Sequence, residues 1–204
     1  MSNPVYNLQK KKVGELELLS AVFDKPLKSV LHQVILGYQT NQRQGTSSVL
    51  TRHFVTGSTR KIYRQKGTGQ ARHGDIKAPI FVGGGNAFGP HPRDWSSPIP
   101  VKLRHEALRE ALSLKKKQEQ LMIVDKFELS KVKTKEAFKT LKGLGLDNAL
   151  VVLDEVTPEA VKSVRNLAHF KVCRSTDLNA LEVMRYDNLL MTVGAVGKVQ
   201  KWLS

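Results

Sequence analysis

Apolar residues alternate between helical and strand-like spacing throughout the second half of the chain. Four segments place apolar side chains at the spacing of a buried helix face, and these lie at residues 107–112, 137–144, 161–167 and 196–203. Four short apolar runs are typical of buried strands, and these lie at residues 121–124, 149–153, 170–172 and 189–193. Because strands and helices alternate, the pattern predicts an α/β fold with a parallel sheet flanked by helices.

The helix expected after residue 156 carries its own start signal. Thr157 is suited to cap the helix, Pro158 to occupy its first turn, and Glu159 to complement its dipole. Gly143 and Gly145 are expected to end the preceding helix.

The N-terminal part of the chain adds two further segments of strand-like pattern and one of helical pattern. Residues 5–8 and 13–19 are strand-like. A helix is predicted by apolar residues that share one face, namely Leu27, Leu31, Val34, Ile35 and Tyr38.

Regular patterning is missing from residues 52–95. The chain contains 25 leucines, yet none lies between Thr51 and Lys102, so this stretch has no apolar face to bury. We predict that residues 1–204 form a single α/β domain and that residues 52–95 form an extended loop inserted within it. A loop of this length without elements of its own is uncommon in a compact domain and is usually functional.

Charge points to a polyanionic partner. The chain has 33 Lys and Arg against 18 Asp and Glu, a net charge of +15. Such a surface favours nucleic acid or an anionic membrane. Residues 52–95 contain eight of the basic residues, eight of the 15 glycines and only two acids, Asp75 and Asp94. No apolar stretch approaches the roughly 18 to 20 residues of a membrane span.

The composition of residues 52–95 suits RNA in particular. Arg and Lys neutralise phosphates, and glycines let the backbone approach them closely. Aromatic rings, which stack on unpaired bases, recur at Phe54, Tyr63, Phe81, Phe88 and Trp95. We expect residues from about 55 to 95 to be mobile in the free protein and to become ordered on RNA. The alternative is a solvated basic linker, although such a linker would need no rings.

A search for catalytic or cofactor chemistry returns weak candidates. Gly83-Gly84-Gly85-Asn86-Ala87-Phe88 nearly matches a dinucleotide fingerprint, but Phe88 replaces the last glycine and no strand and helix flank it. The six histidines lack the spacing of a zinc site, and the single cysteine, Cys173, excludes a disulfide framework and fits a core strand. No metal, no cofactor and no enzymatic activity are therefore expected.

Two further groups of charged residues have structural explanations. Asp154 and Glu155 follow a strand, where α/β enzymes place catalytic acids, but a turn before the Thr157 cap explains them equally well. Residues 115–117, Lys-Lys-Lys, fit a solvated helix C-terminus or a phosphate contact, and the sequence does not separate the two.

Several motifs resemble one family. They are Arg60-Lys61-Ile62-Tyr63-Arg64-Gln65-Lys66-Gly67-Thr68-Gly69-Gln70-Ala71-Arg72, the preceding Asn41-Gln42-Arg43-Gln44-Gly45-Thr46, and the following Gly83-Gly84-Gly85 with Phe88-Gly89-Pro90-His91-Pro92-Arg93-Asp94. Together they are similar to the bacterial-type L-four family of large-subunit ribosomal proteins, and the likeness covers essentially the whole chain.

The resemblance implies a structural constituent of the large ribosomal subunit that binds 23S-type rRNA early in assembly. It implies a loop that lines the polypeptide exit tunnel, beside the L-twenty-two protein and the nascent polypeptide. The resemblance implies a location in cytoplasmic ribosomes, and the sequence is also compatible with an organellar ribosome. A free-standing RNA-binding regulator or RNA chaperone is the alternative.

Matching the motifs residue by residue, together with the composition of the loop, places rRNA contacts at fifteen positions. Arg43, Arg52, Lys77 and Arg93, with Thr51, match the loop stems. The predicted rRNA-binding residues are Arg43, Arg52, Arg60, Lys61, Tyr63, Arg64, Gln65, Lys66, Gly67, Thr68, Gly69, Arg72, His73, Lys77 and Arg93. The chain departs from the family at Gln70 and Val82, where relatives often carry Arg, and at residues 98–101, which are less basic.

Overall fold

The computed structural model describes residues 2–26, 29–127 and 132–204. The chain divides into two compact units: Met1–Gln39 with Pro98–Ser204, here called the body, and Thr40–Ser97, here called the extension. The segment predicted to be inserted, residues 52–95, lies entirely within the extension.

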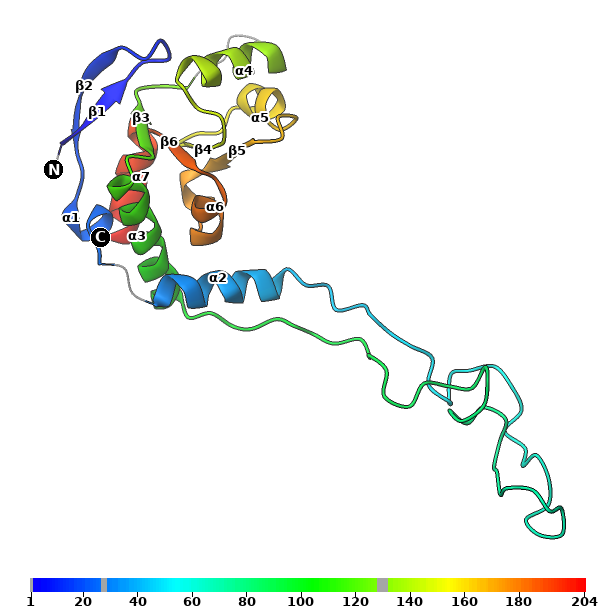
Figure 1. Cartoon of the computed structure of the whole chain (residues 1–204). Helices are drawn as coiled ribbons and strands as arrows, with labels where there is room; N and C mark the ends of the chain where they lie inside the picture. The colour runs from blue at the N-terminus through cyan, green and yellow to red at the C-terminus, as the bar shows by residue number, and fades with distance from the viewer. Residues whose placement is uncertain (1, 27–28, 128–131) are drawn as a thin grey trace. The chain divides into compact units, whose positions relative to one another are not determined.

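The body is built on one six-stranded sheet, and the α/β prediction is confirmed (Figure 1). The strand order is β2-β1-β3-β6-β4-β5. The strands are β1 (Ser2–Tyr6), β2 (Lys12–Glu17), β3 (Leu121–Val124), β4 (Ala149–Leu153), β5 (Phe170–Arg174) and β6 (Asn188–Thr192). The four apolar runs of the second half of the chain are all strands, within one or two residues of the predicted bounds.

One pair of strands departs from the predicted parallel arrangement. β1 pairs with β2 in the antiparallel sense, whereas every other neighbouring pair in the sheet is parallel. The connection between β1 and β2 is a tight turn in which Asn7 Oδ1 accepts the amides of Gln9 (3.0 Å) and Lys11 (2.9 Å). A turn this short can only reverse the chain, because a parallel pair needs a crossover of a dozen or more residues.

Helices cover both faces of the sheet. They are α1 (Ser20–Phe23), α2 (Val30–Asn41), α3 (Val101–Lys117), α4 (Thr134–Gly143), α5 (Pro158–Val164), α6 (Ala180–Arg185) and α7 (Val193–Leu203), with a 3₁₀ turn, η1, at Ser175–Asp177. The pattern did not predict α1, η1 and α6, because segments of six residues or fewer are too short to show a helical period. The helix predicted from Leu27, Leu31, Val34, Ile35 and Tyr38 corresponds to α2. Leu27 lies outside the described residues.

Alternation along the central strands divides the core into two layers. On β4, Leu150 and Val152 face one layer, which also holds buried residues of α1, α2, α3, α6 and α7. Val151 and Leu153 face the other layer, which holds those of α4 and α5. Because successive side chains of a strand point to opposite faces, a strand covered on both sides must be apolar at every position. β4 meets this requirement, with all five residues buried.

Predicted and unpredicted caps define the helix starts. Thr157 Oγ1 accepts the amide of Ala160 (3.4 Å) and Pro158 is the first residue of α5, which confirms the predicted cap. Asn179 and Thr192 cap α6 and α7 through the amides of Glu182 (2.8 Å) and Ala195 (3.3 Å). Each cap satisfies an amide that the first turn of a helix leaves without a partner.

Polar groups of α3 hold the segment that leads to α2. The carboxylate of Glu110 is fully buried, and its Oε2 accepts the amide of Leu31 in the first turn of α2 (3.3 Å). Ser113 Oγ accepts the amide of Lys25 (2.9 Å). α3 therefore anchors the start of α2, the helix that leads into the extension.

Within the described ranges, no helix has the length and apolar content that crossing a membrane requires.

Candidate nucleic-acid interface

The extension has no apolar core. Every residue of both apolar core clusters belongs to the body. Within Thr40–Ser97, the buried residues are Asp75, Lys77 and Gly85. Leucine is absent between Thr51 and Lys102, and Leu50 is 62% exposed. The extension therefore cannot be stabilised by hydrophobic burial of its own.

Two limbs of the extension lie side by side and are joined by widely spaced backbone hydrogen bonds (Figure 1). In each pair the amide of the first residue donates to the carbonyl of the second: Arg93 to Gly45 (3.0 Å), Val49 to Pro90 (3.2 Å), Asn86 to Leu50 (2.9 Å) and Ile62 to Gly74 (2.9 Å). The amide of Gly85 donates to the carbonyl of Lys77 (3.0 Å) within the returning limb. Residues 42–97 are all described and contain no helix or strand. Most backbone groups of the extension are thus available to a partner.

Limited proteolysis should nick the free protein between about residue 55 and residue 95 and leave the body as a resistant core. The reason is that this segment buries little surface and repels itself, whereas the body holds both apolar clusters. Fragment masses from a short trypsin digest would measure this, with an unspecific protease as the control for the many Lys and Arg sites. Strong amide protection of residues 55–95 in the free monomer would contradict the expectation.

The base of the extension is held by a polar clamp. Asn41 Nδ2 donates to the carbonyl of Ser97 (3.1 Å), and the Ser97 amide donates to Asn41 Oδ1 (2.7 Å). Next to this pair, the guanidinium carbons of Arg43 and Arg93 lie 3.5 and 4.1 Å from the centre of the Trp95 ring. Cation–π contact of this kind orients an arginine while leaving its N–H groups available. The structure thus brings two predicted RNA-binding residues together around one ring.

The clamp also depends on the backbone of Gly45. Its φ is +64°, and a Cβ there would lie 1.9 Å from the carbonyl oxygen of Arg93. A left-handed conformation costs an ordinary residue about 1 to 2 kcal/mol, and the clash adds to this cost. Glycine is therefore required where the two limbs first meet.

Gly45→Ala should separate the two limbs at the base of the extension. We expect Trp95 to lose its arginine contacts, which would shift its fluorescence to longer wavelength in a Trp202→Phe background. Gly69→Ala is the matched control, because Gly69 has a similar φ of +69° but nothing within 4 Å of the position that a Cβ would occupy. Equal emission spectra for the two alanine variants would contradict the role assigned to Gly45.

The middle of the extension contains its buried charged residues. Arg52 pairs with Asp75 at 3.1 Å, and the side chain of Asp75 is 9% exposed. Lys77 is only 8% exposed, so its side chain lies inside the extension. Arg52 keeps about half of its side-chain surface exposed and can still reach a phosphate. For Lys77, a phosphate contact stays a prediction that would need the extension to rearrange.

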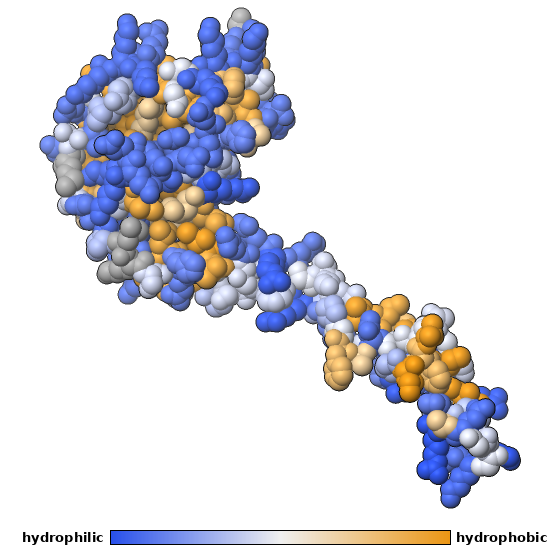
Figure 2. Space-filling model, in the orientation of Figure 1, coloured by the Kyte–Doolittle hydropathy of each residue, from blue (hydrophilic) through white to orange (hydrophobic). Residues whose placement is uncertain are grey.

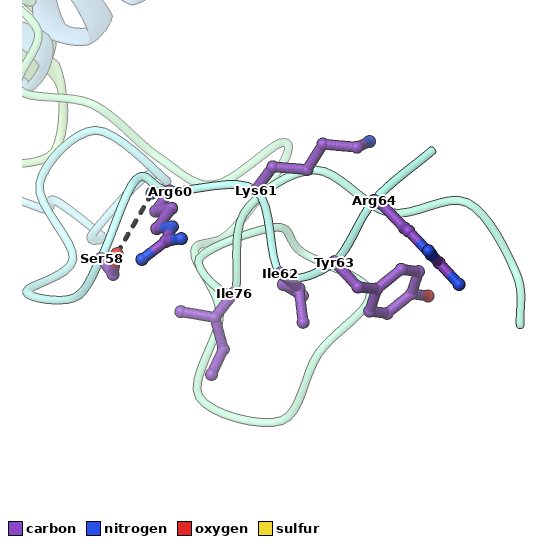
Figure 3. A pocket seen from close by; sticks show the side chains of 7 residues that line it. All are labelled: Ser58, Arg60, Lys61, Ile62, Tyr63, Arg64 and Ile76. Atoms are coloured by element: carbon purple, nitrogen blue, oxygen red, sulfur yellow. Dashed lines mark hydrogen bonds between the residues drawn. The ribbon is translucent and has the colours of Figure 1, made fainter. Parts of the chain in front are cut away.

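Cationic and polar side chains gather near the tip. Ser58, Arg60, Lys61, Ile62, Tyr63, Arg64 and Ile76 line a hollow of about 690 Å³ (Figure 3). Lys61 Nζ donates to Gln65 Oε1 (2.8 Å) and to the carbonyl of His73 (3.1 Å), which orients its ammonium group. Arg64 donates to the carbonyl of Gly67 (2.9 Å), a residue with φ of +80°. The exposed predicted residues here are Arg60, Lys61, Arg64, Gln65, Lys66, Gly67, Thr68, Gly69 and Arg72.

The rings of the extension fall into two sets. His73 contacts both Tyr63 and Phe81 edge to face, with centroids 6.4 and 4.9 Å away, and the Tyr63 hydroxyl donates to the carbonyl of Ala71. Phe54 is 72% exposed, and Phe88 is fully exposed. The first set builds the extension, while the second offers free faces to bases. Phe54 and Phe88 were absent from the predicted site, although their spacing among glycines and cations signalled them.

Exposed apolar residues accompany these rings along the middle of the extension (Figure 2). They are Leu50, Ile76, Ile80 and Val82, each more than half exposed. At the tip, by contrast, Figure 2 shows mainly hydrophilic residues. A partner of the extension therefore meets an apolar surface along its middle and a cationic one at its end.

Residues that were weighed as catalytic candidates have structural roles in the body. Asp154 pairs with Lys198, and this hydrogen bond raises the pKa of the Lys198 ammonium. Burial raises the pKa of the Cys173 thiol to about 12, which disfavours the nucleophilic thiolate. Cys173 is partly buried and packs against the core. No group of three or more His, Cys, Asp or Glu side chains suited to a metal occurs among residues 2–26, 29–127 and 132–204.

The interpretation of residues 115–117 as solvated lysines is wrong for Lys115. Its side chain is 4% exposed, and its Nζ donates to Gln120 Oε1 (2.8 Å) and to the carbonyl of Asp187 (2.9 Å). Burial lowers the pKa of this ammonium group. Lys115 thus ties the end of α3 to the start of β6, and Lys117 is the exposed member of the run.

A compact α/β body with a basic extension that lacks a core, exposes its cations and presents free rings defines a candidate RNA-binding protein. The sequence of residues 16–202 matches that of the ribosomal protein L4/L1 family. The chain therefore belongs to this family, and the resemblance seen in the sequence motifs is confirmed.

Named relatives match along almost their whole length. The large ribosomal subunit protein uL4 of Carboxydothermus hydrogenoformans is 44% identical over 97% of this chain and 97% of its own length. That of Symbiobacterium thermophilum is 44% identical over 98% of this chain and 97% of its own. That of Thermoanaerobacter sp. strain X514 is 42% identical over 97% and 96%.

Proposed function

We propose that this protein is a structural constituent of the large ribosomal subunit and binds 23S-type rRNA early in assembly through its extension. The observation that carries the proposal is the extension itself, which is cationic and lacks an apolar core. Such a segment gains little by folding alone and much by neutralising phosphates. Membership of the L4/L1 family supports the same role, and the role requires no catalysis.

The arrangement within the extension suggests how rRNA would be bound. The orienting contacts of Arg43, Arg93 and Lys61 reduce the conformational entropy that these side chains would lose on binding. Phe54 and Phe88 would stack on unpaired bases, and the exposed residues near the tip would contact phosphates. The extension would thus combine backbone neutralisation with contacts to unstacked bases.

We further infer that the tip lines the polypeptide exit tunnel. There it would contact the nascent polypeptide and the neighbouring L-twenty-two protein. This part of the proposal follows from the resemblance of the motif at residues 60–72. It is supported by the hydrophilic tip, since a surface that lets varied peptides pass should not hold apolar segments.

Co-sedimentation with large subunits tests the proposed function. The protein should remain on the subunit at high salt, because folded rRNA would enclose the extension and make its dissociation slow, even though its affinity for an isolated rRNA fragment falls with salt. A free-standing regulator or RNA chaperone would instead be released, since its contacts would lie on an open surface where salt screens them and dissociation is fast. Complete release at high salt would contradict the proposal and favour that alternative.

A further inference from the structure

A hollow on the body lies among α2, α3, η1 and α7, apart from the extension. Its volume is about 440 Å³, within the range of small-ligand sites. The side chains that matter for recognition are Tyr38, Arg104, His105, Asp177, Asn179 and Trp202. These residues lie far apart in the sequence, so the fold alone brings them together.

Aromatic surface is the first distinguishing feature of the hollow. Trp202, near the end of α7, keeps 43% of its surface exposed, although burying an indole would stabilise the body. Its ring contacts His105 of α3 with centroids 4.9 Å apart and planes at 70°. This contact limits the orientations of both rings. Tyr38, from α2, adds a third ring to the lining.

Charge and hydrogen-bonding groups complete a set suited to a nucleotide. Arg104 lies in the first turn of α3, a helix that begins without a side-chain cap and so has a positive end. A guanidinium at this position can hold a phosphate bidentately. On the opposite chain segment, the carboxylate of Asp177 and the amide of Asn179 can bond the edge of a base.

Two further observations favour an unpaired nucleotide as the occupant. Tyr38 and Val101, which line the hollow, are within a few residues of the two ends of the extension in sequence, so only a short length of chain separates the hollow from the predicted RNA-binding segment. A smaller hollow that shares Trp202 and Thr176 includes Ser175, which is 2% exposed. The Ser175 hydroxyl has no hydrogen-bond partner among the described residues, so the smaller hollow on the other side of Trp202 and Thr176 holds a polar group that a ligand extending into it would satisfy.

We propose that this hollow binds one unpaired nucleotide of RNA, with the base stacked on Trp202 and the phosphate at Arg104. The proposal rests on the proposed function, because it takes RNA as the partner of the protein. It adds a second contact, on the body, to the contacts made by the extension.

Binding of a labelled single-stranded RNA of about six nucleotides to the full-length protein tests the proposal. Trp202→Ala should weaken binding roughly tenfold, the typical loss when one stacking ring is removed, and Trp202→Phe should recover most of it. Phe138→Ala is the matched control, because Phe138 of α4 is equally exposed at 43% but lies outside the hollow. Thermal unfolding of each variant would show that it is folded.

A second measurement keeps the test decisive if the extension dominates oligonucleotide binding. In a Trp95→Phe background, saturating RNA should quench the fluorescence of Trp202. Absence of quenching, or equal affinity of the Trp202→Ala protein and the wild type, would overturn the proposal.

Co-sedimentation of the same variants separates the two proposals. If the wild type stays on large subunits and RNA leaves Trp202 unquenched, the hollow alone is wrong. If the wild type is released at high salt while Trp202 is quenched, the proposed function fails and the hollow stands. A Trp202→Ala protein that binds RNA normally but is lost from the subunit would show that a protein partner fills the hollow, which also overturns the proposal.

Discussion

Deleting residues 60–75 should produce a protein that still folds and still joins the large subunit, but ribosomes that respond differently to macrolides and stall differently during elongation. The body contains both apolar clusters, so its stability does not depend on the deleted residues. The clamp around Trp95 lies outside the deletion and would keep the base of the extension in place.

Chain length explains why the tip has a role that the body cannot supply. The 44 residues from Arg52 to Trp95, at about 3.3 Å each, allow a doubled-back loop to reach at most roughly 70 Å. A body of this size has a radius on the order of 15 to 20 Å. The tip can therefore reach well beyond the body, as its proposed place on the tunnel wall requires.

A single charge reversal should reproduce part of the effect of the deletion. Lys66→Glu would place a carboxylate against the phosphates of the tunnel, whereas Lys133→Glu makes the same change on the body, next to α4, and is the control. Incorporation into subunits and macrolide sensitivity should be compared in one strain. The role of the tip would be wrong if the deletion abolished incorporation, or if fully incorporated protein left sensitivity and stalling unchanged.

Affinity for rRNA should fall steeply as salt is raised. If roughly six to eight of the cations contact phosphates, a plot of log K against log salt should have a slope of about −4 to −7, because each neutralised phosphate releases a counterion. Lys61→Ala and Arg72→Ala should each flatten the slope by roughly one unit. Filter binding or anisotropy with an rRNA fragment would measure it.

Lys133→Ala is the matched control for the salt series. The Lys133→Ala variant loses one positive charge, as Lys61→Ala and Arg72→Ala do. Lys133 is exposed on the body and pairs with Glu136 at 3.1 Å, so this substitution should change the stability of the protein little. Its slope should match that of the wild type. A salt-independent affinity would contradict the electrostatic account of the extension.

Within the extension, the sequence indicates which residue types are suited to contact RNA, and the structure decides which of their side chains remain free to do so. The sequence predicted that Tyr63 and His73 would contact RNA, and in the structure these two rings contact each other, and His73 also contacts Phe81. Which rings remain free depends on how the limbs are paired. That pairing joins positions such as Ile62 and Gly74, which no local pattern connects.

Local spacing in the sequence was sufficient to predict the type and order of most helices and strands from residue 101 to the end of the chain, since apolar periodicity and caps act within a few residues. It was also sufficient for the extension, because a long stretch without leucine cannot build a core. The order of the strands, the antiparallel β1–β2 pair and the burial of Lys77 and Lys115 were decided by the tertiary structure. So was the hollow around Trp202. The antiparallel β1–β2 pair follows from the short turn at Asn7, whereas the other features depend on contacts between residues distant in sequence, and their free energy is defined only once the chain has folded.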